Sequence, residues 1–230
     1  MTALDLALET SRREASLALA LGDTLCGEEL DGRSHASDLL PRLEALLARI
    51  GVERVAGRHA FRAVFVGLGP GSYTGLRVGI ATAQALARAS GALLYGLCSF
   101  EALAFAELAP GESASVAFDA RAGRFYHARY RRTAQGLEVL APPAALRAAE
   151  LAECCAPGGR ILAHAGLAEA AGLAPGVAAR IESTARPSAR ALLALGRARV
   201  ERGELHAAQA LEPLYLGEFG GAPHARTQER

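Results

Sequence analysis

The first half of the chain alternates between short stretches with the apolar period of a strand and longer stretches with the period of a helix. Leucines at every second position over residues 4–8 and 17–21 predict two β-strands, and residues 25–30 form a third. Residues 37–50 place their leucines on one helical stripe, and Gly51 ends the predicted helix. The elements that follow are a strand at 61–67, a helix at about 75–90, a strand at 93–97 and a helix at 99–108.

The second half repeats this order of elements. The predicted strands lie at 116–119, 125–131, 137–140, 161–164 and 177–181, and the predicted helices at 144–155, 166–172 and 188–202. Such a duplication is typical of the actin-like, ribonuclease-H-like (ASKHA) α/β fold, in which two lobes of mixed sheet flanked by helices face a cleft. We expect an N-terminal, partner-binding lobe at 1–108 and a C-terminal lobe at 109–230, with a loose tail from about 219.

A glycine-rich loop separates the strand at 61–67 from the long helix after it. Glycine permits close backbone approach, and the free N–H groups of a helix N-terminus favour anions, so the loop has the features of an anion cradle. In proteins of the expected architecture the first hairpin of each lobe points at the nucleotide phosphates, where a carboxylate can hold Mg²⁺ or orient an attacking water. The candidate nucleotide-binding residues are therefore Glu9, Thr10, Ser11, Gly69, Gly71 and Asp119. The alternative is structural: a tight turn packed against the helix, with hydroxyl groups closing the first hairpin.

Composition and charge narrow the functional classes. The 230 residues include 51% hydrophobic and 21% charged side chains with a formal net charge of +1, typical of a soluble globular protein without a global field for nucleic acid. All 25 basic residues are arginine, which excludes a P-loop lysine and a Schiff-base lysine. The four cysteines and six histidines lack the spacing of metal ligands. Asp5 and Glu9 interrupt the first apolar run and no stretch of 18 apolar residues follows, so we expect a cytoplasmic protein without a signal peptide or membrane span.

The loop and the long helix together resemble the signature of the TsaB (YeaZ) family, bacterial proteins needed to make threonylcarbamoyladenosine in tRNA. The string that carries the resemblance is GPGSYTGLRVGIATAQALA at 69–87, and further similarity lies in RSHASDLLPRLEALL at 33–47, FDARAGRFYHARY at 118–130, PSARALLALGRARV at 187–200 and PLYL at 213–216. The chain departs from the family at three positions: Glu9 stands where many relatives have Asp, Tyr73 where Phe is common, and Gln84 where Lys is usual.

The resemblance implies a non-catalytic subunit. It implies that a relative, TsaD, transfers a threonylcarbamoyl group from its adenylate to N6 of adenosine 37, while the present chain binds TsaD, a further copy of itself and the ATP-binding protein TsaE. ATP or ADP is then bound only weakly or within the complex. The HxxxH pair that binds the catalytic metal in TsaD falls here on Ser99 and Leu103, with Glu101 retained, so the resemblance implies no metal site. The alternatives are an actin-like ATPase or small-molecule kinase that uses Glu9 and Asp119, and a metalloprotease, for which the ligands and the base are lacking.

Small residues line two faces of the long helix. One row consists of Gly75, Gly79, Ala83 and Ala87, and a second of Ala81, Ala85 and Ala89. A helix that is apolar on several sides needs several partners, which are its own sheet, a neighbouring helix or another protein. The resemblance favours a helical bundle shared between two proteins. The expected interface residues are Leu39, Leu43, Leu46, Leu47, Gly75, Arg77, Gly79, Ala83 and Ala87.

A basic hairpin is expected in the second lobe. Five arginines alternate there with three aromatic residues, namely Arg121, Arg124, Phe125, Tyr126, Arg129, Tyr130, Arg131 and Arg132. Arginine and aromatic side chains together suit contact with the phosphates and bases of tRNA. Alternation on an exposed strand face explains the same pattern without a ligand, and both interpretations stay open.

Overall fold

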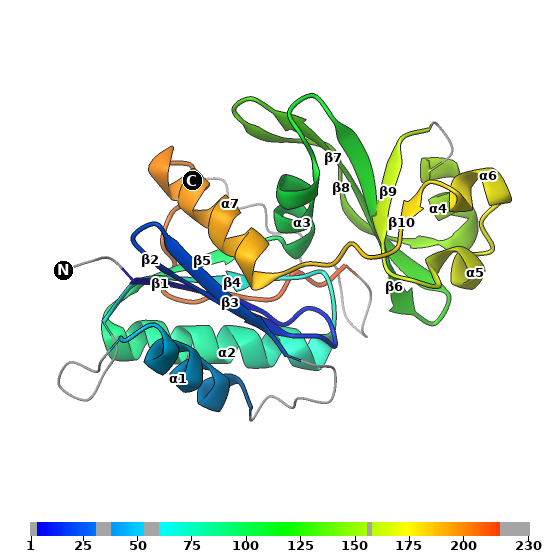
Figure 1. The fold of residues 1–230 in the computed structure, drawn as a ribbon. Coiled ribbons are helices and arrows are strands. Elements are labelled where there is room, and N and C mark those ends of the chain that lie inside the picture. The colour runs from blue at the N-terminus through cyan, green and yellow to red at the C-terminus, as the bar shows by residue number, and fades with distance from the viewer. Residues whose placement is uncertain (1–3, 31–37, 53–59, 156–157, 217–230) are drawn as a thin grey trace.

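Two five-stranded mixed sheets form the framework of the computed structural model, which describes residues 4–30, 38–52, 60–155 and 158–216 (Figure 1). The first sheet contains β1 (Leu4–Glu9), β2 (Ser16–Leu21), β3 (Thr24–Glu29), β4 (Phe61–Gly67) and β5 (Leu93–Leu97) in the order β3-β2-β1-β4-β5. The second contains β6 (Ser113–Arg121), β7 (Arg124–Thr133), β8 (Gly136–Arg147), β9 (Arg160–Ala163) and β10 (Ile181–Glu182) in the order β10-β9-β6-β7-β8. From its other edge the second order matches the first strand by strand, so the predicted duplicated actin-like fold is confirmed.

Helices α1 (Leu39–Arg49) and α2 (Tyr73–Ser90) cover one face of the first sheet (Figure 1). Alternation along β1 explains this arrangement, because successive side chains of a strand point to opposite faces. Leu6 and Leu8 belong to the cluster that contains the buried stripes of both helices, whereas Ala7 belongs to the cluster on the opposite face.

Helix α2 begins and ends at signals in its own sequence. The hydroxyl of Ser72 accepts a hydrogen bond from the backbone N–H of Gly75 at 3.3 Å, and Gly91 follows the helix with a φ of 72°. The cap at Ser72 places the start of the helix two residues before the expected position. In the described part of the chain, no helix has both the length and the apolar character required to cross a membrane.

The last helix returns to the first lobe. Helix α7 (Ala189–Glu201) lies on the face of the first sheet opposite α1 and α2, where Leu192 packs in a cluster with Phe65 (Figure 1). The chain then continues along the same lobe, since the backbone N–H of Leu214 donates to the carbonyl of Leu68 at 2.7 Å. Residues 189–216 therefore pack with the first lobe, which corrects the expected division at residue 108. The tail expected from 219 lies outside the described residues.

The second sheet is covered on both faces as well. Helix α3 (Ser99–Glu107) packs on one face through Phe100 and Leu103, and α4 (Ala148–Cys155) and α5 (Leu167–Ala171) pack on the other through Leu151 and Leu167. Helix α3 also contacts α7, so it connects the two lobes.

Two elements differ from the sequence prediction. Strand β8 continues through Pro142 and Pro143 to Arg147, so α4 begins at Ala148 instead of residue 144. Proline is tolerated there because β8 is an edge strand, whose outer N–H groups have no partner strand. The predicted strand at 177–181 instead holds the end of helix α6 (Pro175–Ala178), for which the proline in the first turn is favourable, then a turn and the first residue of the short β10 (Ile181–Glu182).

Candidate functional site

The acidic residue of the first hairpin is buried. Glu9 is the last residue of β1 and is fully inaccessible to solvent. One of its carboxyl oxygens accepts a hydrogen bond from the backbone N–H of Ser11 at 2.6 Å. Burial raises the pKa of Glu9 above its ordinary value of 4.5, and hydrogen bonds from Ser11 oppose that shift only in part. Glu9 is therefore an inward-facing carboxyl group whose ionised form is less favourable than that of an exposed glutamate.

Glycines bring helix α2 into direct contact with the β1–β2 turn. A Cβ atom at Gly71 would overlap the carbonyl oxygen of Ser11, and one at Gly75 would overlap the carbonyl oxygen of Thr10. A Cβ at Gly79 would meet the Thr10 side chain. Because the carbonyls of the turn occupy this space, the glycines permit close packing of protein on protein. Of the two interpretations of the glycine-rich loop, the structure favours the tight turn packed against a helix.

The loop that precedes α2 also donates hydrogen bonds to protein groups. The backbone N–H of Ser72 donates to the carbonyl of Ser11 at 2.7 Å. Ahead of the helix, the hydroxyl of Ser99 accepts a hydrogen bond from the backbone N–H of Gly69 at 3.3 Å. The structure thus brings Glu9, Thr10, Ser11, Gly69 and Gly71 together, as predicted, but around protein groups. Binding of a nucleotide there stays a prediction.

The two hairpins meet across the lobes. Asp119 near the end of β6 is exposed, and its carboxylate accepts a hydrogen bond from the backbone N–H of Arg121 at 2.7 Å. From the first hairpin, the guanidinium carbon of Arg12 lies 4.6 Å from the centre of the Phe118 ring. Burial lowers the pKa of Arg12, and the charges of Glu14 and Asp119 act against that shift. The hairpins therefore face each other, with Arg12 as the side chain that connects them.

Ser99, Glu101 and Leu103, where the resemblance led us to look for metal ligands, have structural contacts within the chain. Ser99 and Leu103 are both buried, and Leu103 packs in the core beneath the second sheet. Glu101 forms an ion pair with Arg199 of α7 at 2.6 Å. Within the described residues no group of three or more His, Cys, Asp or Glu side chains is arranged to bind a metal.

The small-residue row that begins at Gly75 faces its own lobe, which corrects the expected interface. Gly79, Ala83 and Ala87 are buried, and the two alanines belong to the cluster beneath the first sheet. The physical reason is steric, because α2 can approach the sheet and the β1–β2 turn only where its side chains are small. The row therefore serves contact within the chain.

The leucine stripe of α1 is corrected in the same way. Leu39, Leu43, Leu46 and Leu47 are all buried in the core that α1 and α2 share with the first sheet. The outer face of the two helices is formed by other residues. The second small-residue row, Ala81, Ala85 and Ala89, is exposed on α2, and Leu40 is 52% exposed on α1.

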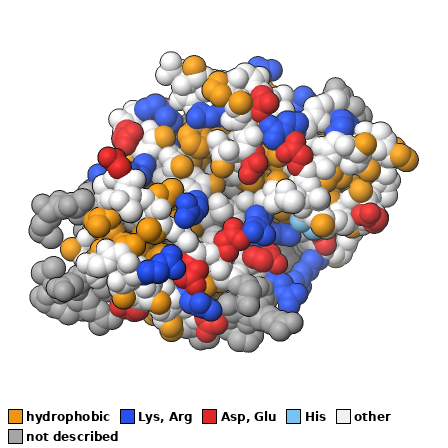
Figure 2. Space-filling view, in the orientation of Figure 1, with side chains coloured by type: hydrophobic (Ala, Val, Ile, Leu, Met, Phe, Trp, Pro, Cys, Tyr) orange, Lys and Arg blue, Asp and Glu red, His pale blue; other side chains and the backbone are white. Residues whose placement is uncertain are grey.

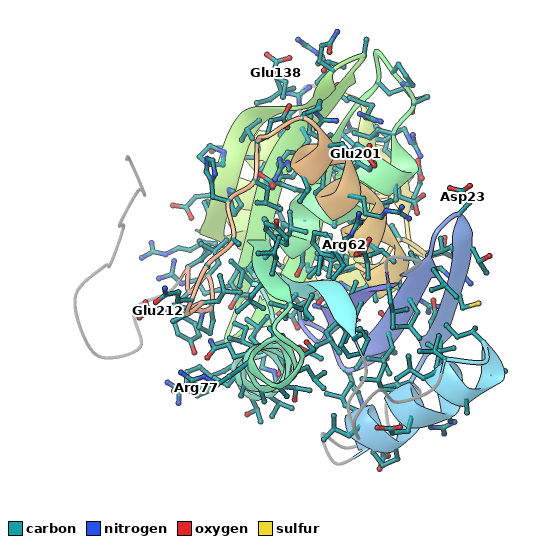
Figure 3. All side chains as sticks on the ribbon, turned by 90° about the vertical axis from the view of Figure 1, so that its left-hand side faces the viewer. Asp23, Arg62, Arg77, Glu138, Glu201 and Glu212 are labelled. Carbon is teal, nitrogen blue, oxygen red and sulfur yellow. The ribbon has the colours of Figure 1, made fainter. Side chains whose placement is uncertain are left out.

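Arg77 is the exposed member of the expected interface. Figure 3 shows it pointing outward from α2, on the side of the molecule that carries Glu212. Its guanidinium group lies 4.2 Å from the Tyr73 ring and donates to the Tyr215 hydroxyl at 3.1 Å. Sequence reasoning did not predict this contact, because it joins α2 to a segment 138 residues away.

Gln84 ties the same segment to α2. Its side-chain amide donates to the backbone carbonyl of Leu211 at 3.1 Å. The position that carries lysine in many relatives is thus used here for an internal hydrogen bond.

Four arginines of the basic hairpin fall into two groups, two with partners within the chain and two that are exposed. Arg131 forms an ion pair with Glu138 at 3.1 Å. Arg132 stacks over the Phe105 ring at 3.9 Å and donates to the carbonyl of Gly136 at 3.0 Å. These two side chains therefore have partners within the chain, whereas Arg121 and Arg124 at the β6–β7 turn are exposed.

Comparison with known proteins places this fold and its motifs in a family. The family model described as TsaD: tRNA N6-adenosine threonylcarbamoyltransferase matches residues 29–192. The tRNA threonylcarbamoyladenosine biosynthesis protein TsaB of Haemophilus influenzae is 35% identical over 130 residues, which are 55% of this chain and 53% of that protein. TsaB of Escherichia coli is 32% identical over 135 residues, which are 57% of each chain. The matches thus span about half the length of these curated relatives.

Solved structures extend the similarity to nearly the whole chain. YeaZ from Pseudomonas aeruginosa superimposes with a TM-score of 0.75 and 26% identity over 93% of this chain and all of its own. A second Pseudomonas aeruginosa structure, described as similar to peptidase YEAZ, gives a TM-score of 0.76 and 26% identity over 94% of this chain. The chain therefore belongs to the TsaD family of tRNA N6-adenosine threonylcarbamoyltransferase proteins, and its relatives place it with the TsaB (YeaZ) members.

Proposed function

We propose that this chain is a non-catalytic subunit of the cytoplasmic machinery that forms N6-threonylcarbamoyladenosine at position 37 of tRNA, and that it binds and supports the catalytic subunit TsaD. The proposal rests on the burial and contacts of the residues at which the resemblance would place metal ligands. Ser99 and Leu103 are buried without a metal-binding atom directed to solvent, and Glu101 is engaged by Arg199. A chain with this arrangement contributes to the reaction through a partner.

The partner surface in this proposal is the outer face of α1 and α2. Ala81, Ala85 and Ala89 leave the backbone of α2 accessible to a second helix, and Leu40 adds an exposed apolar side chain. TsaD, or a second copy of this chain, binds there. TsaE joins the complex as the ATP-binding partner.

The rival function, an actin-like ATPase or kinase, needs an ionised carboxylate in the cleft. Glu9 is fully buried, and its raised pKa favours the neutral form. Asp119 is exposed, and its carboxylate accepts a hydrogen bond from the backbone N–H of Arg121 at 2.7 Å. These observations favour a subunit that binds nucleotide weakly or only within the complex.

We expect the purified chain to contain no stoichiometric zinc or iron and to form no threonylcarbamoyladenosine by itself. Metal analysis and mass spectrometry of nucleosides from an unmodified tRNA transcript, incubated with ATP, threonine and bicarbonate plus the enzyme that makes the adenylate, check both points. TsaD and TsaE are then added with and without the chain, and the modified nucleoside should accumulate when the chain is present. One equivalent of tightly bound metal, or transfer without TsaD, contradicts the proposal.

Glu9→Gln should stabilise the isolated chain at neutral pH. Because the pKa of Glu9 is raised in the folded state, the folded carboxyl binds more protons than the unfolded one above about pH 4.5, so stability falls as pH rises until the folded group has also ionised. Glutamine is neutral at every pH and removes that loss. Denaturant unfolding from pH 4 to 8 should show a flatter profile for the variant.

Calorimetry with ATP and Mg²⁺ on the same two proteins separates the functional alternatives. Micromolar ATP binding that disappears in Glu9→Gln would favour the ATPase. A variant less stable than the parent at pH 7 would mean that the ionised carboxylate is preferred in the fold.

A further inference from the structure

Three arginines from three strands meet at one end of the second sheet. In the pairing of β6 with β7, Arg121 lies opposite Arg124, and in the pairing of β7 with β8, Arg124 lies opposite Arg147. The regular spacing of directly paired residues, with Cβ atoms about 5 Å apart, applies to Arg124 and Arg147. Arg121 follows an irregularity in the pairing and has a φ of 67°, and it lies next to Arg124 at the turn between the strands. We call Arg121, Arg124 and Arg147 the arginine triad. The sequence did not reveal it, because Arg147 lies 23 residues after Arg124 and outside the predicted strand.

The triad lacks counter-charges within the described part of the chain. Asp119 and Glu150 are the nearby acids, and their carboxylates accept hydrogen bonds from the backbone N–H groups of Arg121 and Arg147, not from guanidinium groups. All three triad side chains are exposed. Like charges placed directly opposite each other on a sheet are unfavourable. A fold that tolerates this arrangement gains from an anion bound between the strands.

Aromatic side chains lie between the arginine triad and the junction of the two lobes. Tyr126 lies two residues after Arg124 on β7 and so shares its face of the sheet. It pairs with Phe118 of β6, whose ring stacks on that of His164 at 5.6 Å. Arg12 of the first lobe approaches the same Phe118 ring.

Tyr126 also has surface available for contacts. It is half-buried, so part of the residue is accessible. Figure 2 shows basic side chains grouped at the lower edge of the molecule where the two lobes meet. The surface thus combines exposed guanidinium groups with accessible aromatic area.

We propose that the arginine triad binds the phosphate backbone of a single-stranded RNA segment, with a base stacked on Tyr126. Guanidinium groups with adjacent aromatic rings are the chemistry by which proteins hold single-stranded RNA. The choice of RNA among polyanions rests on the proposed function, in which the substrate is tRNA. The triad lies on an exposed sheet end, which suits a polymer that passes over the surface.

The test is fluorescence anisotropy of the full chain with two labelled probes, an unmodified tRNA transcript and a single-stranded oligoribonucleotide, over a series of salt concentrations. The test variant is Arg124→Ala/Arg147→Ala. The matched control is Arg42→Ala/Arg131→Ala, which removes two exposed arginines that are paired with Glu28 and Glu138. Both variants change the net charge equally, so a non-specific charge effect weakens both to the same extent.

We expect the test variant to bind each probe about a hundredfold more weakly, at roughly tenfold for each arginine. The logarithm of the association constant decreases linearly with the logarithm of the salt concentration. For the oligoribonucleotide this negative slope should become shallower by about 1.4, since each lost phosphate contact to a single strand removes about 0.7 from its magnitude. The control should stay within about threefold of the parent. Its melting temperature should fall slightly, whereas that of the test variant should stay the same or rise, because an unfavourable arginine pair has been removed.

Equal weakening of test and control variants would overturn the proposal. ATP that displaces the oligoribonucleotide at micromolar concentration would also overturn it, since the site would then recognise a nucleotide. Co-elution of each variant with TsaD keeps this inference separate from the proposed function. Retained co-elution with lost RNA binding supports the triad as the RNA site, whereas lost co-elution of the test variant shows that the triad binds a protein.

Discussion

The Ala83→Arg variant is expected to unfold its N-terminal lobe. Ala83 is fully buried in the cluster where α2 packs against Leu6 and Val64 of the first sheet. Overpacking a core typically costs about 1–3 kcal/mol, and burial of an unpaired charge adds several kcal/mol. The free energy of unfolding of a whole domain is only about 5–15 kcal/mol. The substitution therefore removes most of the stability of the lobe.

Circular-dichroism melting measures this effect, and Ala85→Arg is the matched control. Ala85 lies two residues further along the same helix and is exposed, and arginine is nearly as favourable in a helix as alanine. The control should melt within a few degrees of the parent. If Ala83→Arg instead keeps the parental melting temperature and no longer binds TsaD, the helix face that contains Ala83 contacts a partner. The assignment of Ala83 to the core is then wrong.

Local periodicity was sufficient to predict most of the strands and helices. The alternation of leucines at 4–8 and 17–21 predicted β1 and β2, and α2 was predicted after the glycine-rich loop, two residues later than it begins. The repeated element order predicted the duplicated fold. The return of α7 to the first lobe was missed, because the packing of Leu192 against Phe65 joins residues more than a hundred positions apart.

Periodicity also could not decide what covers each face of a helix. Ala81 and Ala83 are chemically identical and two residues apart, yet one is exposed and the other is in the core. The same holds for α1, where the leucine stripe at Leu43 and Leu46 is covered by the first sheet and only Leu40 remains outside. A stripe of apolar residues predicts burial, and the sheet of the same chain is the nearest surface that can provide it.

In the candidate site, too, some features could be predicted from local sequence and others depended on the folded structure. The residues around Glu9 were expected together because the first hairpin and the glycine-rich loop have recognisable local signals. The sequence could not predict the burial of Glu9, and burial raises the pKa of its carboxyl group, which makes it a less suitable ligand for a metal ion. The arginine triad depended on strand register, since only the pairing of β7 with β8 places Arg147 opposite Arg124.

The Ala81→Arg variant is expected to stay folded and to lose its partner. Ala81 lies on the exposed row of α2, one turn from Ala85, where the proposed function places a closely packed helix of TsaD or of a second copy. An arginine there is solvated in the free chain, so stability is unchanged. In the complex its long side chain separates the helices, and its charge is buried without a partner. The cost of several kcal/mol corresponds to a loss of about three decades in affinity.

Size-exclusion chromatography with TsaD and light scattering of the chain alone measure the two associations. Ala170→Arg, an exposed alanine of α5 in the other lobe, is the matched control and should co-elute with TsaD like the parent. The melting temperatures of the parent, Ala81→Arg and Ala170→Arg, measured by circular dichroism, should agree within a few degrees. A loss of binding then cannot be explained by unfolding of the variant. If Ala81→Arg is well folded and co-elutes fully with TsaD, the outer face of α2 is not the partner surface. Docking must then be sought on another face of the first lobe, beginning with the exposed side chains of Tyr73, Arg77 and Tyr215.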